Sequence, residues 1–179
     1  MKQLRTIALA AFALAGLAGV TSASAELPTG TKAPAFSTKA ALAGKEFGFA
    51  LKSALAKGPV VLYFYPKAFT QGCTLEANAF AEAMPQFKAA GASVIGMSAD
   101  DIATLKEFSR KECRDAFPVG IASPAVAKAY DVAMGQSGLT TRTSYVIAKD
   151  GTIVAVHSNP DYRGHVAQTL AAVKALRTK

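Results

Sequence analysis

The chain has 179 residues, and its 20 basic and 12 acidic side chains give a formal charge of +8. Hydrophobic residues make up 51% of the chain, and its mean hydropathy is +0.23. This composition excludes a disordered tail protein, a multi-span membrane protein and a disulfide-dense mini-protein. The basic residues are spread along the chain without a Lys/Arg-rich run. We therefore predict a solvated cationic surface and expect neither nucleic acid nor a membrane as a partner.

The first 25 residues have the pattern of a cleavable export signal. Two basic residues open it, residues 7–20 form an apolar run shorter than a membrane span, and Ala23-Ser24-Ala25 is a small-x-small cleavage site. We predict a signal peptide over residues 1–25, one mature domain over residues 26–179, and a secreted or periplasmic protein. Cleavage would shorten the chain from 179 to 154 residues and lower its charge from +8 to +6.

The mature chain is predicted to alternate strands and helices. Residues 26–45 are expected to be irregular, residues 47–51 to form a short edge strand, and the apolar run 60–65 to form a strand buried on both faces. The other predicted elements are, in chain order, a helix over 70–90, a strand over 93–98, a helix over 102–111, a strand over 117–121, a helix over 124–130, a hairpin of strands 144–148 and 152–157, and a helix over 164–176.

Local signals define several of these elements. Pro85 is expected to kink or restart the helix over 70–90, and Asp100 and Asp101 are candidate caps of the following helix. The apolar face of the helix over 70–90 is predicted to contain four residues, Leu75, Ala79, Ala83 and Phe87.

Parallel strands joined by helices, followed by an antiparallel hairpin, predict an α/β protein with a thioredoxin-like fold: a central mixed β-sheet flanked by helices. A flavodoxin-like sheet is the alternative, but that sheet does not end in a hairpin.

Two cysteines, Cys73 and Cys113, lack the Cys-x-x-Cys spacing of a thioredoxin-type redox pair. In an oxidising compartment they can form one structural disulfide. The chain has only two histidines, so we expect no Cys/His metal site.

Cys73 has a setting that favours reactivity. It follows the strand over 60–65 and lies in the first turn of a helix for which Thr70 is a natural N-cap. Unpaired N–H groups at a helix start carry partial positive charge and stabilise a thiolate. The strand-to-helix loop also lies at the carboxyl edge of the sheet, where ligands bind. We predict a reactive thiol; the alternative is a buried cysteine that only fills space.

Residues 60–80, VVLYFYPKAFTQGCTLEANAF, resemble the peroxidatic segment of the peroxiredoxins, most closely that of the bacterioferritin-comigratory subfamily. Pro66, Thr70 and Cys73 match the signature Pro-x-x-x-Thr-x-x-Cys. Arg142, at the start of the hairpin, matches the distant arginine of the family. The resemblance covers about residues 32–179, and four matching residues in order make it specific.

The resemblance implies a thiol-dependent peroxidase that reduces hydrogen peroxide or organic hydroperoxides without metal, flavin or haem. The Cys73 thiolate attacks the O–O bond and becomes a sulfenic acid. Thr70 hydrogen-bonds the peroxide oxygen and the sulfur, Arg142 supplies positive charge to both, and Pro66 shields the sulfur. Glu76 occupies the place of the carboxylate that orients the arginine, although an exposed surface glutamate is equally compatible with the sequence.

Three positions depart from the subfamily pattern. Ala68 and Gln71 stand where Asp and Pro are common, and Asn78 stands where a second cysteine is frequent. Some relatives place the resolving cysteine in the next helix. On this basis we predict a Cys73–Cys113 disulfide, for which the first helical turn must unwind, because in such folds the thiols start beyond the disulfide limit of about 7 Å between Cα atoms.

The basic residues that flank Cys113 predict a partly ionised, accessible thiol. The alternative is a one-cysteine cycle that an external thiol resolves, with Cys113 as a bystander.

The expected partners are a peroxide substrate and a dithiol reductant such as a thioredoxin-like protein. The expected assembly is a monomer or small homodimer. Two other functions stay open. One is a thiol-disulfide oxidoreductase, which the missing Cys-x-x-Cys disfavours. The other is a non-catalytic thioredoxin-like binding domain with a static disulfide, which needs neither Thr70 nor Arg142.

Overall fold

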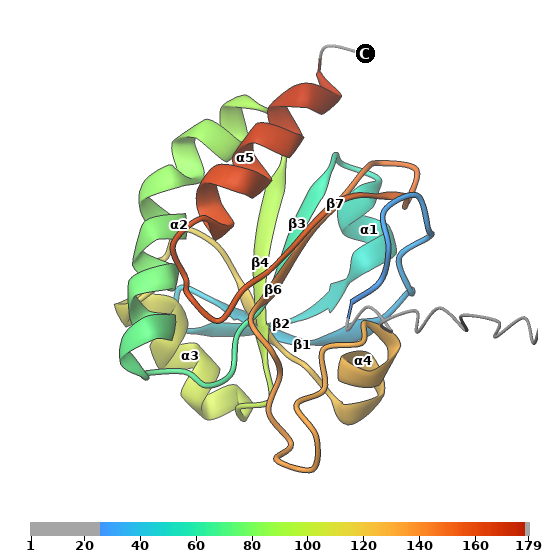
Figure 1. Ribbon diagram of the computed structural model, residues 1–179. Coiled ribbons are helices and arrows are strands. Elements are labelled where there is room, and N and C mark those ends of the chain that lie inside the picture. The colour runs from blue at the N-terminus through green and yellow to red at the C-terminus, as the bar shows by residue number, and fades with distance from the viewer. Residues whose placement is uncertain (1–25, 178–179) are drawn as a thin grey trace, which may run out of the picture.

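The computed structural model describes residues 26–177, so the predicted signal peptide lies outside the described residues. The elements of this part are β1 (Ser37–Leu42), β2 (Lys45–Ala50), α1 (Leu51–Leu55), β3 (Val60–Phe64), α2 (Gln71–Ala89), β4 (Ser93–Ser98), α3 (Ile102–Lys111), β5 (Val119–Ile121), α4 (Pro124–Ala129), β6 (Thr143–Ile147), β7 (Ile153–Ser158) and α5 (His165–Leu176) (Figure 1). No helix among these residues is long and apolar enough to span a bilayer.

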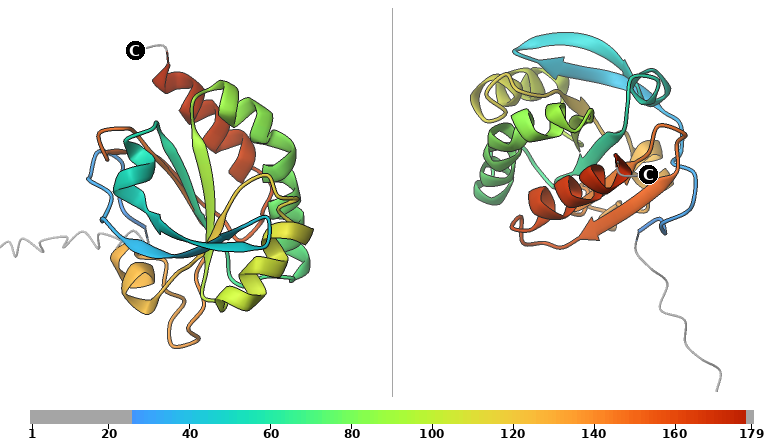
Figure 2. Two further views of the ribbon diagram at one scale, coloured as in Figure 1. Left: turned by 180° about the vertical axis from the view of Figure 1, so that it is seen from behind. Right: turned by 90° about the horizontal axis from the view of Figure 1, so that it is seen from above.

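The strands form one mixed sheet in the order β2-β1-β5-β4-β3-β6-β7. β3, β4 and β5 are parallel, whereas β1 and β6 run antiparallel to their neighbours, and β7 completes the hairpin with β6. Helices α2, α3 and α5 cover one face, and α1 and α4 cover the other (Figure 2). This arrangement confirms the α/β, thioredoxin-like fold predicted from the sequence.

The central strand β3 is buried on both faces, as its apolar run predicts. Val61 and Tyr63 point into the core beneath α2, α3 and α5, whereas Val60, Leu62 and Phe64 point into the core beneath α1 and α4. This alternation has the period of two that a pleated strand imposes. β3 therefore contributes side chains to both hydrophobic cores, and it leads directly into the loop that precedes Cys73.

The first elements of the described residues differ from the sequence prediction. Residues 37–42 are not irregular but form β1, which pairs with β2 and, through Ala40 and Ala41, with β5. β2 begins at Lys45 and ends at Ala50, close to the edge strand predicted over 47–51, and a short helix, α1, follows it. Most of β2 is exposed, so its residues do not show the regular alternation that marks a half-buried strand.

Helix α2 continues through Pro85 and does not restart there. Its buried face includes Cys73, Ala77, Phe80 and Phe87, spaced three, four or seven residues apart. Leu75 was assigned to this face and is instead 43% exposed. Two residues beyond Cys73, it lies more than half a turn around the helix and faces solvent.

Candidate active site

Cys73 lies in the first turn of α2 and is 2% exposed. The loop before it is anchored to the next strand, because the Asp100 carboxylate accepts hydrogen bonds from the Ala68 amide and the Ser98 hydroxyl, both at 2.8 Å. Phe69 adopts a left-handed conformation (φ 62°), and its ring packs edge-on against Phe108. These contacts fix where α2 begins and therefore where the sulfur lies.

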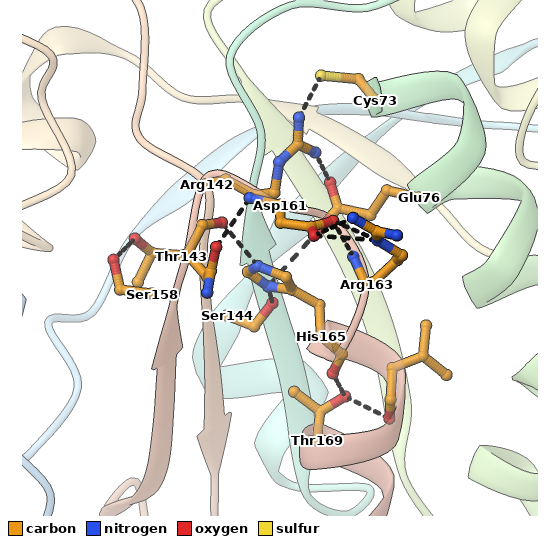
Figure 3. Close-up of polar contacts among 12 residues, drawn as sticks. Cys73, Glu76, Arg142, Thr143, Ser144, Ser158, Asp161, Arg163, His165 and Thr169 are labelled. Atoms are coloured by element: carbon orange, nitrogen blue, oxygen red, sulfur yellow. Dashed lines mark hydrogen bonds and ion pairs between the residues drawn. The ribbon is translucent and has the colours of Figure 1, made fainter. Parts of the chain in front are cut away.

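Arg142 approaches the sulfur from the start of β6, beside β3 in the sheet. Its Nη2 atom donates a hydrogen bond to Cys73 Sγ at 3.5 Å, and its Nη1 atom donates to Glu76 (Figure 3). Its Nε atom donates to the Pro160 carbonyl at 3.0 Å. Burial by itself lowers the pKa of Arg142, but the neighbouring Glu76 and Cys73 reverse this and raise it. The guanidinium therefore stays charged and is held from three sides.

Glu76 is fully buried one turn after Cys73, so it is not the exposed surface glutamate that the sequence left open. Its Oε2 atom accepts from Arg142, whereas its Oε1 atom has no hydrogen-bond partner among the described residues. Burial raises the pKa of Glu76 to about 8, and the attraction of Arg142 offsets only part of this effect.

His165, which sequence analysis did not assign to the site, lies against Glu76. Its Nε2 atom is 3.0 Å from the Asn159 carbonyl, and its Nδ1 atom is 2.8 Å from Ser144 Oγ (Figure 3). A carbonyl only accepts, so Nε2 carries the hydrogen and Nδ1 accepts from Ser144. Burial lowers the pKa of His165 to about 4, which keeps the ring neutral near neutral pH. Glu76 and Ser144 lie far from His165 in sequence, so no local pattern indicates that they meet.

Thr70 and Pro66 flank the loop before α2. Thr70 occupies the predicted N-cap position, but its hydroxyl does not cap the helix; it donates to the Lys67 carbonyl at 2.9 Å and is exposed. Pro66 and Arg142 line one open cavity of about 220 Å³. The rest of its lining is Met134, Thr141, Ser158 and Pro160. The cavity gives solvent a path to the guanidinium that contacts the sulfur.

Cys113 is fully buried just beyond α3, contrary to the predicted accessible and partly ionised thiol. Burial, followed by the charges of Glu112 and Asp115, raises its pKa well above the ordinary value. The basic side chains near it face outward; Arg114, for example, pairs with Glu82 at 3.1 Å on the surface. Both cysteines are free thiols that belong to the same buried hydrophobic cluster.

Within residues 26–177, no group of three or more His, Cys, Asp or Glu side chains is arranged to hold a metal ion. The charged group in contact with Cys73 is the guanidinium of Arg142, which stabilises an anionic sulfur.

Comparisons with known proteins agree with this site. Residues 29–156 match the model of the AhpC/TSA family. The chain is 35% identical over 150 residues to peroxiredoxin Q, chloroplastic, of Oryza sativa subsp. japonica, covering 82% of this chain and 67% of that protein.

Two solved structures are also similar to the chain. For peroxidoxin BcpB from Mycobacterium tuberculosis, the TM-score is 0.75 at 32% identity, covering 83% of this chain and 97% of that one. For Xanthomonas campestris peroxiredoxin Q, the TM-score is 0.67 at 31% identity, covering 76% and 89%. The chain therefore belongs to the AhpC/TSA family and, as its sequence signature predicts, is a peroxiredoxin.

Proposed function

We propose that this protein is a thiol-dependent peroxidase in which Cys73 reduces hydrogen peroxide and organic hydroperoxides. The observation that carries the proposal is the approach of Arg142 Nη2 to within 3.5 Å of Cys73 Sγ at the start of a 19-residue helix. A fixed cation and the unpaired N–H groups of the first helical turn both stabilise a thiolate. The open cavity lined by Pro66 and Arg142 is proposed as the route by which the peroxide enters.

In the first step, the Cys73 thiolate attacks one peroxide oxygen; the S–O bond forms as the O–O bond breaks. The sulfur loses two electrons, and the leaving oxygen gains them and is protonated. Arg142 is positioned to stabilise the charge that develops on the leaving oxygen. Thr70 is exposed next to this site and is proposed to hydrogen-bond the peroxide when it binds.

Trapping the oxidised sulfur tests the first step. Reduced protein is mixed with one equivalent of peroxide in the presence of a sulfenic-acid-specific dione, and its peptides are analysed by mass spectrometry. The proposal expects the adduct on Cys73, and no adduct and no peroxide turnover in Cys73→Ser. An active Cys73→Ser protein would assign the reaction to another group.

We further propose that Cys113 resolves the Cys73 sulfenic acid by forming an intramolecular disulfide. Because Cys113 is buried, the segment after α3 must open as well as the first turn of α2. Two consecutive residues of this segment, Arg114 and Asp115, have left-handed backbones with φ of 50° and 57°, a conformation that costs non-glycine residues energy. Release of this strain favours an opened segment.

Two side-chain contacts link α2 to α3 and the segment after it, and they must break when α2 and this segment open. Asn78, at the position where relatives often have a second cysteine, donates to Glu112 Oε2 at 3.3 Å. The exposed Glu82–Arg114 ion pair adds a weak second link.

Peptide mapping without reductant, after one equivalent of peroxide, tests the disulfide. The proposal expects a monomeric chain with a Cys73–Cys113 linked peptide. A lasting Cys73 sulfenic acid with Cys113 still free would instead show a one-cysteine cycle with an external resolving thiol.

A dithiol protein of the thioredoxin type is proposed to return the disulfide to the reduced state.

The peroxidase itself is proposed to act after export, without residues 1–25. N-terminal sequencing of protein from the producing cells tests the export proposal. A chain that starts at Glu26 supports it, whereas a chain that retains Lys2 and Arg5 in the cytoplasm contradicts it.

A further inference from the structure

One buried cation lies between two acidic groups in this site. Arg142 contacts Cys73 through Nη2 and Glu76 through Nη1, and all three side chains are more than nine-tenths buried. In the described part of the chain, no second cation pairs with Glu76. One cation balances one anion, but a Cys73 thiolate together with an ionised Glu76 leaves an excess buried negative charge, which is costly.

The surrounding groups do not supply the missing positive charge. His165 on α5 is kept neutral by burial, and His157 on β7 packs edge-on against its ring with centroids 4.5 Å apart. In the loop after β7, Asp161 and Arg163 pair with each other at 2.7 Å. Burial raises the pKa of Tyr63 on β3, which also faces Glu76 and Cys73, so its hydroxyl stays neutral. The charge balance therefore involves only Arg142, Cys73 and Glu76.

One carboxylate oxygen of Glu76 receives no hydrogen bond from the described residues. Its buried Oε1 atom has no hydrogen-bond partner and lies 3.7 Å from His165 Nδ1, whose lone pair already accepts from the Ser144 hydroxyl. An ionised carboxylate is an acceptor on both oxygens, so an oxygen without a donor weakens the ionised form. The raised pKa of Glu76, about 8, is consistent with this geometry.

We propose that Glu76 takes up a proton on Oε1 when Cys73 loses its own, so that the two residues together hold one negative charge beside Arg142. The shared charge lies either on Glu76, as Cys73–SH with Glu76–COO⁻, or on the sulfur, as Cys73–S⁻ with Glu76–COOH. The contact of Arg142 with the sulfur and the start of α2 favour the second form, which is the reactive one. Glu76 acts through the shared guanidinium and is a charge-balancing residue rather than one that touches the peroxide.

The proton balance of the first step follows. The thiolate, the protonated Glu76 and ROOH give the sulfenic acid, the Glu76 carboxylate and ROH. The leaving RO⁻ gains one proton while Glu76 releases one, because the sulfur is no longer an anion. The step therefore takes no net proton from solvent. This inference rests on the proposed function but makes a separate claim, since a permanently ionised Glu76 is also compatible with a peroxidase.

The pH dependence of the Cys73 thiolate provides the first test. Two groups that share one charge titrate in two macroscopic steps with a plateau between them. In the reduced wild-type protein, the rate of alkylation of Cys73, corrected for the reagent, should change less than about twofold across the plateau. Glu76→Gln, which keeps an acceptor oxygen for Arg142 but cannot share a charge, should show one step with about a tenfold rise per pH unit below its midpoint. Wild-type and Gln curves of the same single-step shape overturn the proposal.

Infrared difference spectroscopy on protein labelled with ¹³C-glutamate provides the second test. Alkylation of Cys73 removes the thiolate, so the carboxylic-acid band of Glu76 should disappear and a carboxylate band should replace it. The change should be absent in Glu76→Gln. It should persist in Glu82→Gln, a matched control on the same helix whose carboxylate is exposed and paired with Arg114. A Glu76 that remains ionised throughout, in a protein that still reduces peroxide, overturns the charge sharing and leaves the proposed function intact.

Discussion

Replacement of His165 by Phe should change how stability depends on pH. The folded protein holds this histidine at a pKa of about 4, whereas an unfolded histidine titrates near 6.5. The folded state therefore excludes a proton that the unfolded state binds, and stability is lost as pH falls from 6.5 to 4. A difference of 2.5 pKa units corresponds to about 3 kcal/mol, an upper value because local relaxation reduces it.

Glu76 titrates in the opposite sense, because its raised pKa makes the folded state bind a proton that the unfolded state has lost between about pH 4.5 and 8. The two residues have opposite effects on how the free energy of unfolding of the wild type changes with pH, so that quantity alone does not isolate His165. The difference in free energy of unfolding between the wild type and His165→Phe does isolate it. At pH 7, His165→Phe should be less stable by about 1–3 kcal/mol, because Ser144 and the Asn159 carbonyl lose their partners.

Urea denaturation of both reduced proteins at pH 7, 6, 5 and 4 measures this difference. The stability gap should shrink by up to about 3 kcal/mol as the pH falls, because only the wild type loses stability through His165. Thr169→Val, a buried change one turn along α5, is the matched control and should keep a constant gap. A gap for His165→Phe that stays constant over the same range would refute the reasoning.

Three other substitutions test separate parts of the site and the core. Arg142→Ala should slow the reaction with peroxide by about 100- to 1000-fold in stopped flow, because the contact to the sulfur is lost, and should keep a native circular dichroism spectrum. An unchanged rate would mean that another cation stabilises the Cys73 thiolate. Asp100→Ala should slow the same reaction severalfold and lower the free energy of unfolding by about 1–3 kcal/mol in urea denaturation, since the Ala68 amide loses its acceptor. Wild-type values of both the rate and the stability would show that the loop before α2 does not depend on Asp100. Gly96→Ala should cost about 1–3 kcal/mol or more, because the new Cβ would lie 2.7 Å from the Tyr63 ring, and a wild-type melting temperature would contradict this packing.

The sequence predicted the parts of the fold whose signals are local. The apolar run of β3, the Asp101 cap of α3 and the Lys149–Gly151 turn lie within a few residues of the elements they define, and each appears in the structure. β1 was missed, and the edge strand predicted over 47–51 overlaps β2 in four of its six residues but starts two residues late. β2 lies at the edge of the sheet and largely in solvent, so burial imposes little pattern on its sequence.

Sequence analysis predicted the site residues that belong to the family signature and missed the features that depend on tertiary contacts. Cys73 and Arg142 are brought together as the signature predicts, and Glu76 joins them. The prediction that Cys113 is accessible and partly ionised was wrong, because charged neighbours in sequence do not reveal which way a side chain points. Its own side chain enters the core, while that of Arg114 faces solvent. The position of His165 depends on a carbonyl and a hydroxyl from other segments, which no spacing indicates.

The most direct test of the central claim is a stopped-flow measurement of the loss of the Cys73 thiol when reduced protein meets micromolar peroxide. The measurement uses Cys113→Ser so that one thiol is followed, with free cysteine at the same pH as the reference. The account predicts a second-order rate constant at least about 100-fold above that of free cysteine, because Arg142 and the start of α2 stabilise both the thiolate and the leaving oxygen. A rate equal to that of free cysteine would contradict the assignment of Cys73 as the peroxidatic residue.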